Sequence, residues 1–173
     1  MRRLLIVLAL LISVIANAQI QTKFWGLELA KCYGSLDEAR EIISQRCKHS
    51  MIQDNQIVAL DGNLGGYNWN YATFSFLDNT LYSVSFVSYY KTFEDAVDKT
   101  AHLEVDLTRK YGKSYKAEGT LTYYWADEDF TNKCYLDLSE GMSNGGEKLW
   151  YITLNYWNKS LNENATQQIK DEL

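Results

Sequence analysis

The sequence lacks proline altogether and has only two histidines and three cysteines in 173 residues. Because proline is absent, every residue of the expected strands has a backbone N–H that can donate a hydrogen bond within a sheet. A nucleophile needs a neighbouring base, yet His49 lies beside Cys47 with one residue between them, and His102 lies in an expected helix. Zinc-type Cys/His spacings are also lacking. We therefore predict no catalytic residues, no metal and no cofactor, and interpret the chain as not being an enzyme.

Positive charge is also scarce. The chain has 17 basic and 22 acidic residues, a formal net charge of −5. Loss of Arg2 and Arg3 with an N-terminal leader would leave 15 basic residues and a charge of about −7. Because an acidic protein is repelled by phosphate backbones, we expect no nucleic acid among its partners.

Long apolar runs are lacking except at the N-terminus. Met1-Arg2-Arg3 is followed by an apolar run over residues 4–15 and then by Ala16-Asn17-Ala18, a small-residue cleavage pattern. This arrangement predicts a signal peptide over residues 1–18, cut near Ala18-Gln19, and a periplasmic or secreted mature protein. The run is shorter than the roughly 20 residues of a membrane-spanning helix, so we expect no transmembrane segment in the mature chain.

The C-terminus offers an alternative compartment. Lys170-Asp171-Glu172-Leu173 matches the retention signal of the endoplasmic-reticulum lumen, so a luminal resident protein is an alternative interpretation. The same stretch continues a pattern in which Leu161, Ala165 and Ile169 recur every four residues, and this pattern predicts a helix over about 160–172 with Ser160 as its cap. The tetrapeptide is then the end of that helix, and both interpretations stay open.

The three cysteines, Cys32, Cys47 and Cys134, all follow the expected leader. An oxidising compartment permits a disulfide between Cys32 and Cys47, although the helix expected between them would hold its ends apart. Buried free thiols are the alternative, and the pairing stays open.

Two segments open with the same helix-start pattern. Ser35 and Thr92 are each followed by an apolar residue, two acids and alanine, so each hydroxyl can cap an amide three residues on. Three strand-like segments follow each helix, with the turn signals Asp78-Asn79 and Ser143-Asn144-Gly145-Gly146 before two of the strands. We predict an α+β fold over residues 19–173 that consists of a duplicated helix plus three-stranded antiparallel meander, with helices on one face of the sheet. The repeat units would span about 24–90 and 91–157.

Three segments carry a resemblance to known proteins: "FWGLELAKCYGSLDEAREII", "LDGNLGGYNWNYATFSFLDNTLYSVSF" and "LTRKYG". This layout is similar to small secreted proteins of Bacteroidota, in which an F-x-G-I/L motif precedes a capped helix and K-Y-G ends a second one. The chain has Trp25 and Ala30-Lys31-Cys32 where such proteins often have Gly-x-Ser. More distantly, it resembles the tandem fold of β-lactamase inhibitor proteins and the outer-membrane assembly lipoprotein BamE. The resemblance implies a fold and a binding role, without a reaction.

Aromatic residues are plentiful, with 13 tyrosines and 5 tryptophans. In "YNWNYATFSF" they occupy odd positions first and even positions afterwards, so one set must face away from the core unless a bulge intervenes. The alternation predicts an aromatic binding face for a protein or glycan, formed by Tyr67, Trp69, Tyr71, Tyr151 and Trp157. Cross-strand stabilisation is the alternative role of these rings.

The acidic stretch "WADEDF" supplies a different alternative. Paired carboxylates among Asp127, Glu128 and Asp129 could support glycoside hydrolysis if the structure held them the right distance apart. The simpler interpretation is a solvated hairpin loop, because acids are ordinary turn residues.

Overall fold

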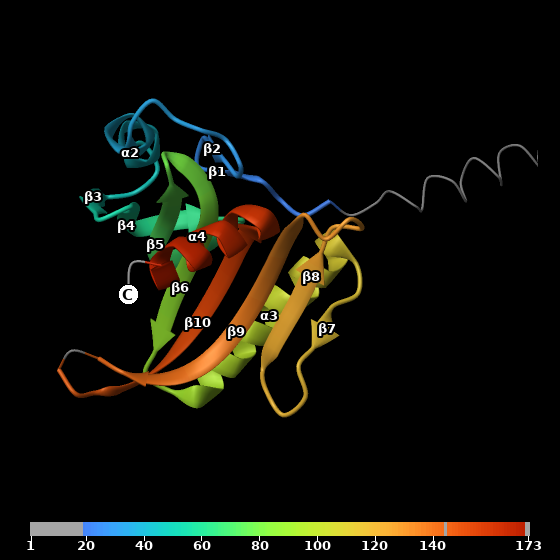
Figure 1. Cartoon of the computed structure of the whole chain (residues 1–173). Coiled ribbons are helices and arrows are strands. Elements are labelled where there is room, and N and C mark those ends of the chain that lie inside the picture. The colour runs from blue at the N-terminus through green and yellow to red at the C-terminus, as the bar shows by residue number, and fades with distance from the viewer. Residues whose placement is uncertain (1–18, 144, 172–173) are drawn as a thin grey trace, which may run out of the picture.

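The computed structural model describes residues 19–143 and 145–171, without the side chains of Ile169 and Asp171. Eight strands form one antiparallel sheet in the order β3-β4-β5-β6-β10-β9-β8-β7 (Figure 1). These strands are β3 (His49–Gln53), β4 (Gln56–Leu64), β5 (Tyr67–Leu77), β6 (Thr80–Tyr90), β7 (Tyr115–Lys116), β8 (Thr122–Ala126), β9 (Asn132–Met142) and β10 (Lys148–Asn158). A separate two-stranded sheet pairs β1 (Lys23–Phe24) with β2 (Leu27–Glu28).

The described residues also form three helices, α2 (Leu36–Ser44), α3 (Phe93–Tyr111) and α4 (Lys159–Asp171). The caps expected for the first two are confirmed. Ser35 Oγ accepts a hydrogen bond from the amide of Glu38, and Thr92 Oγ1 accepts one from the amide of Asp95, both at 3.2 Å. The cap expected for α4 is wrong, because Asn158 Oδ1 rather than Ser160 accepts the amide of Leu161.

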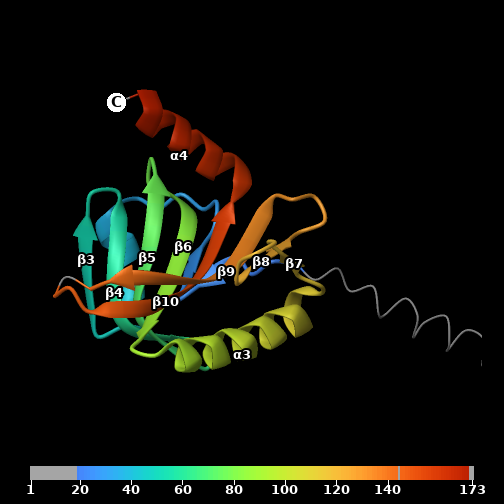
Figure 2. The same cartoon turned by 90° about the horizontal axis from the view of Figure 1, so that it is seen from below.

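The predicted fold class is wrong. Instead of three-stranded meanders with helices on one face, the chain forms a mostly β structure around one eight-stranded sheet, with α4 on the opposite side from α3 (Figure 2). The prediction missed β3, which is short and polar, and β7, which has only two residues. Strands this short and this polar have little of the apolar alternation from which strands are recognised.

Pairing between β6 and β10 joins the first four strands to the last four. The register runs from Trp150 opposite Tyr90 to Trp157 opposite Ser83, over most of both strands. Side chains at paired positions lie on the same face of a sheet, so this register also aligns the two faces across the junction. One face is covered by α3, and we call it the covered face.

The covered face holds the core. Phe86 is fully buried, and its ring centroid lies 6.0 Å from that of Phe24 and 6.2 Å from that of Phe74. Helix α3 adds Leu103, Leu107 and Tyr111 from its buried side, and the ring of Tyr111 meets that of Tyr156 at 6.4 Å. Other fully buried side chains are Leu27, Ile43, Ile57, Leu81, Val84, Leu136 and Ile152.

Helix α4 crosses the other side of the sheet near the β5–β6 hairpin (Figures 1 and 2). Ala165 is buried there and borders a hollow of about 290 Å³ together with Phe76 and Tyr82. Lys170 and Asp171 belong to this helix, whereas Glu172 and Leu173 lie outside the described residues. The luminal interpretation of the tetrapeptide therefore stays a prediction.

The first described residues are held against the sheet by burial and by a hydrogen bond. Ile20 is buried, and its amide donates a 2.5 Å hydrogen bond to Asp127 Oδ1 in the loop between β8 and β9. The expected signal peptide, residues 1–18, lies outside the described residues. None of the helices in the part of the chain that the structure describes is long and apolar enough to cross a membrane.

All three cysteines lie in the described chain and are free thiols, so the structure contains no Cys32–Cys47 disulfide. Cys32 is exposed, Cys47 is half-buried and Cys134 is buried. Cys47 Sγ lies 3.6 Å from the carbonyl oxygen of Ile43 at the end of α2. Burial raises the pKa of both Cys47 and Cys134 above the ordinary thiol value, which keeps these two thiols protonated at neutral pH.

Candidate binding face of the sheet

The face opposite α3 carries aromatic and polar side chains, and we call it the open face. The register shows that Tyr71 pairs with Val87, Val87 with Thr153, and Thr153 with Asp137, so these side chains share one face across four strands. Alternate positions along the same strands belong to it as well. Its central and aromatic members are Tyr71, Thr73, Ser85, Val87, Tyr89, Thr122, Tyr124, Lys133, Tyr135, Asp137, Tyr151, Thr153, Asn155 and Trp157.

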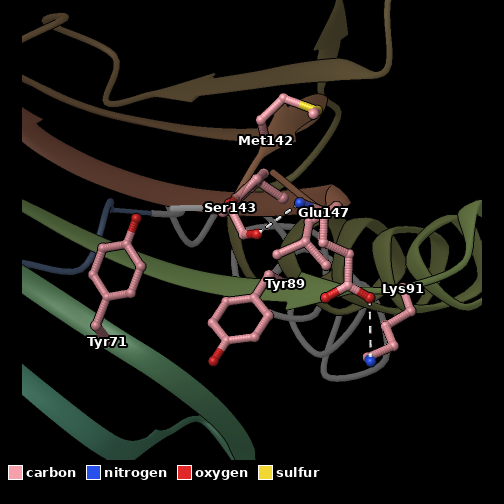
Figure 3. Close-up of a pocket in the computed structure, with 8 residues that line it drawn as sticks. Tyr71, Tyr89, Lys91, Met142, Ser143 and Glu147 are labelled. Carbon is pink, nitrogen blue, oxygen red and sulfur yellow. Dashed lines mark hydrogen bonds and ion pairs between the residues drawn. The ribbon is translucent and has the colours of Figure 1, made fainter. Parts of the chain in front are cut away.

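Three tyrosines gather at one end of the open face, which we call the tyrosine end. Tyr71, Tyr89 and Tyr151 come from β5, β6 and β10, and they line a hollow of about 630 Å³ (Figure 3). The ring centroids of Tyr89 and Tyr151 are 6.3 Å apart at an interplanar angle of 57°. Tyr89 is 46% exposed, so this side chain reaches solvent instead of closing the hollow.

The rim of the hollow is fastened by polar contacts. Lys91 Nζ lies 3.2 Å from Glu147 Oε1, which links the end of β6 to the turn before β10 (Figure 3). The amide of Glu147 donates to Ser143 Oγ at 3.1 Å, and the largely buried Leu149 also lines the hollow. These contacts hold the β9–β10 turn beside the tyrosines.

Gly141 makes room for Tyr151. A Cβ atom at residue 141 would lie 2.8 Å from Cε2 of the Tyr151 ring, closer than side chains normally approach. The ring therefore lies directly over the backbone of β9. The lack of a side chain at residue 141 thus leaves room for the Tyr151 ring on the open face.

A second group of rings lies farther along β8, β9 and β10, and we call it the tryptophan end. Tyr135 lies 6.1 Å from Tyr124 and 5.5 Å from Trp157 between ring centroids. Tyr124 is 39% exposed, and the other two rings are half-buried. Both groups are therefore reachable from solvent on one face of the sheet.

Polar side chains lie between and beside the two groups of rings, and we call them the polar strip. Its members are half-exposed hydroxyl, amide and carboxylate groups: Thr73, Ser85, Thr122, Asp137, Thr153 and Asn155. Three of them have partners within the sheet, since Thr122 Oγ1 donates to Asp137 Oδ1 at 2.6 Å and Ser83 Oγ donates to Asn155 Oδ1 at 2.9 Å. Each such group keeps further donor or acceptor capacity for a ligand.

Burial controls the ionisation of Tyr71. Burial, and secondly the neighbouring Tyr151, raises the pKa of the Tyr71 phenol above its ordinary value. The hydroxyl therefore stays protonated to a more alkaline pH than an ordinary tyrosine does, and in this form it can both donate and accept hydrogen bonds.

Three of the five predicted binding residues lie on the open face, namely Tyr71, Tyr151 and Trp157. Trp69 lies instead in the core, where it is 3% exposed and its ring is 5.7 Å from Phe86. Tyr67 faces α3, and its hydroxyl donates to Asp106 Oδ2 at 2.6 Å. Burial and this hydrogen bond raise the pKa of Tyr67 to about 12.

A local distortion separates Trp69 from Tyr71. Leu60 pairs with Tyr71 and Gly62 with Trp69, but Asp61 between them has a φ of 54°, a left-handed conformation that breaks regular pairing. Trp69 turns to the covered side there, whereas Tyr71 stays on the open face. Strict alternation places residues 69 and 71 on the same face of a strand, so the sequence pattern predicted one binding face for both Trp69 and Tyr71.

Sequence reasoning missed Tyr89, Tyr124 and Tyr135. Tyr89 continues the alternation of Ser83, Ser85 and Val87 along β6, and this signal was present in the sequence. Tyr135 lies between buried Cys134 and Leu136, which also indicates an outward position. The sequence of each single strand does not indicate which strands are neighbours, and so it could not show that Tyr89 lies beside Tyr151 or that Tyr135 lies beside Trp157.

Two carboxylates of the alternative hydrolase site, those of Asp127 and Asp129, accept hydrogen bonds in and around the β8–β9 loop. Asp127 accepts the amide of Ile20 through Oδ1 and, through Oδ2, the Nδ2 of Asn132 at 2.9 Å. Asp129 Oδ1 accepts the amide of Thr131 at 3.0 Å, and its contacts with Thr131 lower the pKa of Asp129. Within the described ranges, no three His, Cys, Asp or Glu side chains are grouped closely enough to hold a metal ion.

Comparisons with family models, curated proteins and solved structures found no match to this chain. The resemblance noted in the sequence therefore stays an expectation, and the function has to be argued from the open face.

Proposed function

We propose that this chain is an exported, non-catalytic binding protein that holds its ligand on the open face of the sheet. The observation that carries the proposal is the tyrosine end, where Tyr71, Tyr89 and Tyr151 from three strands line a hollow of about 630 Å³. The N-terminal leader pattern, with its cleavage site near Ala18-Gln19, supports export.

Exposed rings favour binding over simple stabilisation of the sheet. Cross-strand aromatic pairs stabilise a sheet by up to about 1 kcal/mol each, and the Tyr89–Tyr151 pair can do so. That role does not require a hollow, nor does it require 46% of Tyr89 to remain in water. Tyrosine and tryptophan dominate recognition sites because they bring a large apolar surface together with a polar group.

The test compares open-face variants with a matched aromatic control. The mature protein, its Tyr89→Ala/Tyr151→Ala double variant and its Phe130→Ala variant would be immobilised, and their binding to a surface extract of the source organism measured by biolayer interferometry. Phe130 is 59% exposed in the β8–β9 turn, away from the tyrosine end, so its removal controls for loss of an exposed ring.

We expect the double variant to lose at least tenfold in affinity while the Phe130→Ala variant binds as the parent does. Removing an aromatic anchor typically costs more than about 1.4 kcal/mol, which corresponds to that factor. Equal binding by the double variant and the parent would contradict the proposal. Circular dichroism of all three proteins checks that the fold is kept.

A further inference from the structure

We propose that the ligand of the open face is an uncharged carbohydrate chain that spans both aromatic ends; this inference rests on the proposed binding function. Tyr151 and Trp157 lie on the same strand, six residues apart, so about 20 Å separates them at the rise of a β-strand. A single sugar ring cannot reach both ends, whereas an oligosaccharide can.

The order of apolar and polar groups favours a carbohydrate over a protein. Protein interfaces place an apolar, desolvated core at the centre and polar groups at the rim. Along β10 on the open face the order is the reverse, because polar Thr153 and Asn155 lie between Tyr151 and Trp157. A sugar chain matches this order because each unit offers apolar C–H surfaces to a ring and hydroxyl groups to a polar strip.

The polar strip has the hydrogen-bonding chemistry that sugar hydroxyls need. Thr73, Ser85 and Thr153 have hydroxyl groups that can each donate one hydrogen bond and accept others. The Asn155 amide adds two donors, and Asp137 adds carboxylate acceptors beyond the one that Thr122 occupies. All these side chains are half-exposed, so a ligand can reach them without unfolding the sheet.

The charges on the face favour an uncharged ligand. Lys91 forms an ion pair with Glu147 at the tyrosine end, and Asp137 and Lys133 lie one on each side of Tyr135 along β9. Two positive and two negative side chains thus lie on the same face, and the whole chain has a formal charge of −5. A polysaccharide rich in carboxylate or sulfate groups would gain no net attraction there.

The experiment fractionates the surface extract before binding is measured. The extract is first treated with proteinase K, then passed over an anion-exchange column, and the unretained fraction is tested against the mature protein by biolayer interferometry. A portion of this fraction is hydrolysed in acid to monosaccharides and tested again. The variants are Tyr151→Ala, Trp157→Ala and the control Phe130→Ala.

We expect the protease-treated, unretained fraction to bind the parent protein and to lose at least tenfold in binding after acid hydrolysis. Tyr151→Ala and Trp157→Ala should each weaken the binding at least tenfold, since the chain contacts both ends, and Phe130→Ala should leave it unchanged. Parent-like binding by Trp157→Ala would overturn the extended-chain arrangement.

Other outcomes separate this inference from the proposed function. If proteinase K abolishes binding of the extract, while untreated extract still depends on Tyr89 and Tyr151, the ligand is a protein and only the carbohydrate inference fails. If binding activity stays on the anion-exchange column, the ligand is charged and the inference fails in the same way. If even untreated extract binds the parent and the Tyr89→Ala/Tyr151→Ala variant equally, both proposals fail.

Discussion

The two faces of the sheet place rings from the same strands in opposite environments. On β6, Phe86 is fully buried on the covered face, whereas Tyr89, three residues on, is 46% exposed on the open face. On β10, Tyr156 is buried against Phe24 at a centroid distance of 4.6 Å, whereas Tyr151 lines the open hollow. Ring content alone therefore does not distinguish the core from the surface in this protein.

The elements that lie over each face make the difference. Helix α3 and the β1–β2 segment close the covered face with Tyr111, Phe24 and Leu27, so its rings contact one another and exclude water. Among the elements that the structure describes, α4 alone lies over the open face, near the β5–β6 hairpin, and the rings elsewhere on this face remain accessible. Stability should therefore depend on the covered face and binding on the open face, and four measurements test this division.

The largest effect is expected from Phe86→Ala on the covered face. Phe86 contacts Phe24, Trp25, Trp69 and Phe74, so its loss leaves a cavity in the most densely aromatic part of the core. We expect the free energy of unfolding to fall by about 3–5 kcal/mol, measured by urea denaturation. The matched open-face change, Tyr89→Ala, should lower the free energy of unfolding by less than about 1 kcal/mol. Equal losses of unfolding free energy in the two variants would contradict the division of roles between the two faces.

A smaller effect is expected from Gly62→Ala beside the core. A Cβ atom at residue 62 would lie 2.1 Å from Cη2 of Trp25, whose ring packs on Phe74 and Phe86. Because the ring cannot move without disturbing these neighbours, we expect a loss of about 1–3 kcal/mol in unfolding free energy. Gly65 has open space around its Cβ position but a φ of 63°, so Gly65→Asn, which tolerates that conformation, is a near-neutral control.

Alkaline pH should weaken the covered face through Tyr111. Burial raises the pKa of Tyr111 to about 12, whereas the unfolded chain has a tyrosine pKa near 10. The folded state thus keeps the proton that the unfolded state loses, so this contribution is complete below about pH 10 and disappears as the pH rises toward 12. Urea unfolding at several pH values should show the decline, and Tyr111→Phe should make it shallower; an unchanged slope would contradict the assignment.

The smallest effect on stability is expected from Gly141→Ala on the open face. The new Cβ would meet the Tyr151 ring at 2.8 Å, but that ring is half-exposed and borders a hollow into which it can shift. We expect a cost below about 1 kcal/mol, together with a several-fold loss of ligand affinity because the ring is displaced. A large loss of stability with unchanged affinity would reverse the roles of the two faces.

Some of the candidate site could be read from strand alternation. Tyr151 and Trp157 alternate with Ile152, Leu154 and Tyr156, and the structure places the two sets on opposite faces. The same rule fails at Trp69, because Asp61 on the neighbouring strand adopts a left-handed conformation and the alternation is interrupted. A pattern that counts residues along one strand carries no information about such a distortion in its partner.

The sequence alone determined the features that depend on contacts between residues close in the chain. The caps at Ser35 and Thr92 each join groups three residues apart, and the Asp78-Asn79 turn joins adjacent strands through two residues with positive φ. The tertiary structure decided which face of the sheet would be covered. Helix α3 closes one face and α4 crosses the other, and β10 pairs with β6 although the paired residues are 60 to 74 positions apart in the chain. These arrangements depend on the sum of many weak, non-directional apolar contacts between distant segments, which no short sequence pattern encodes.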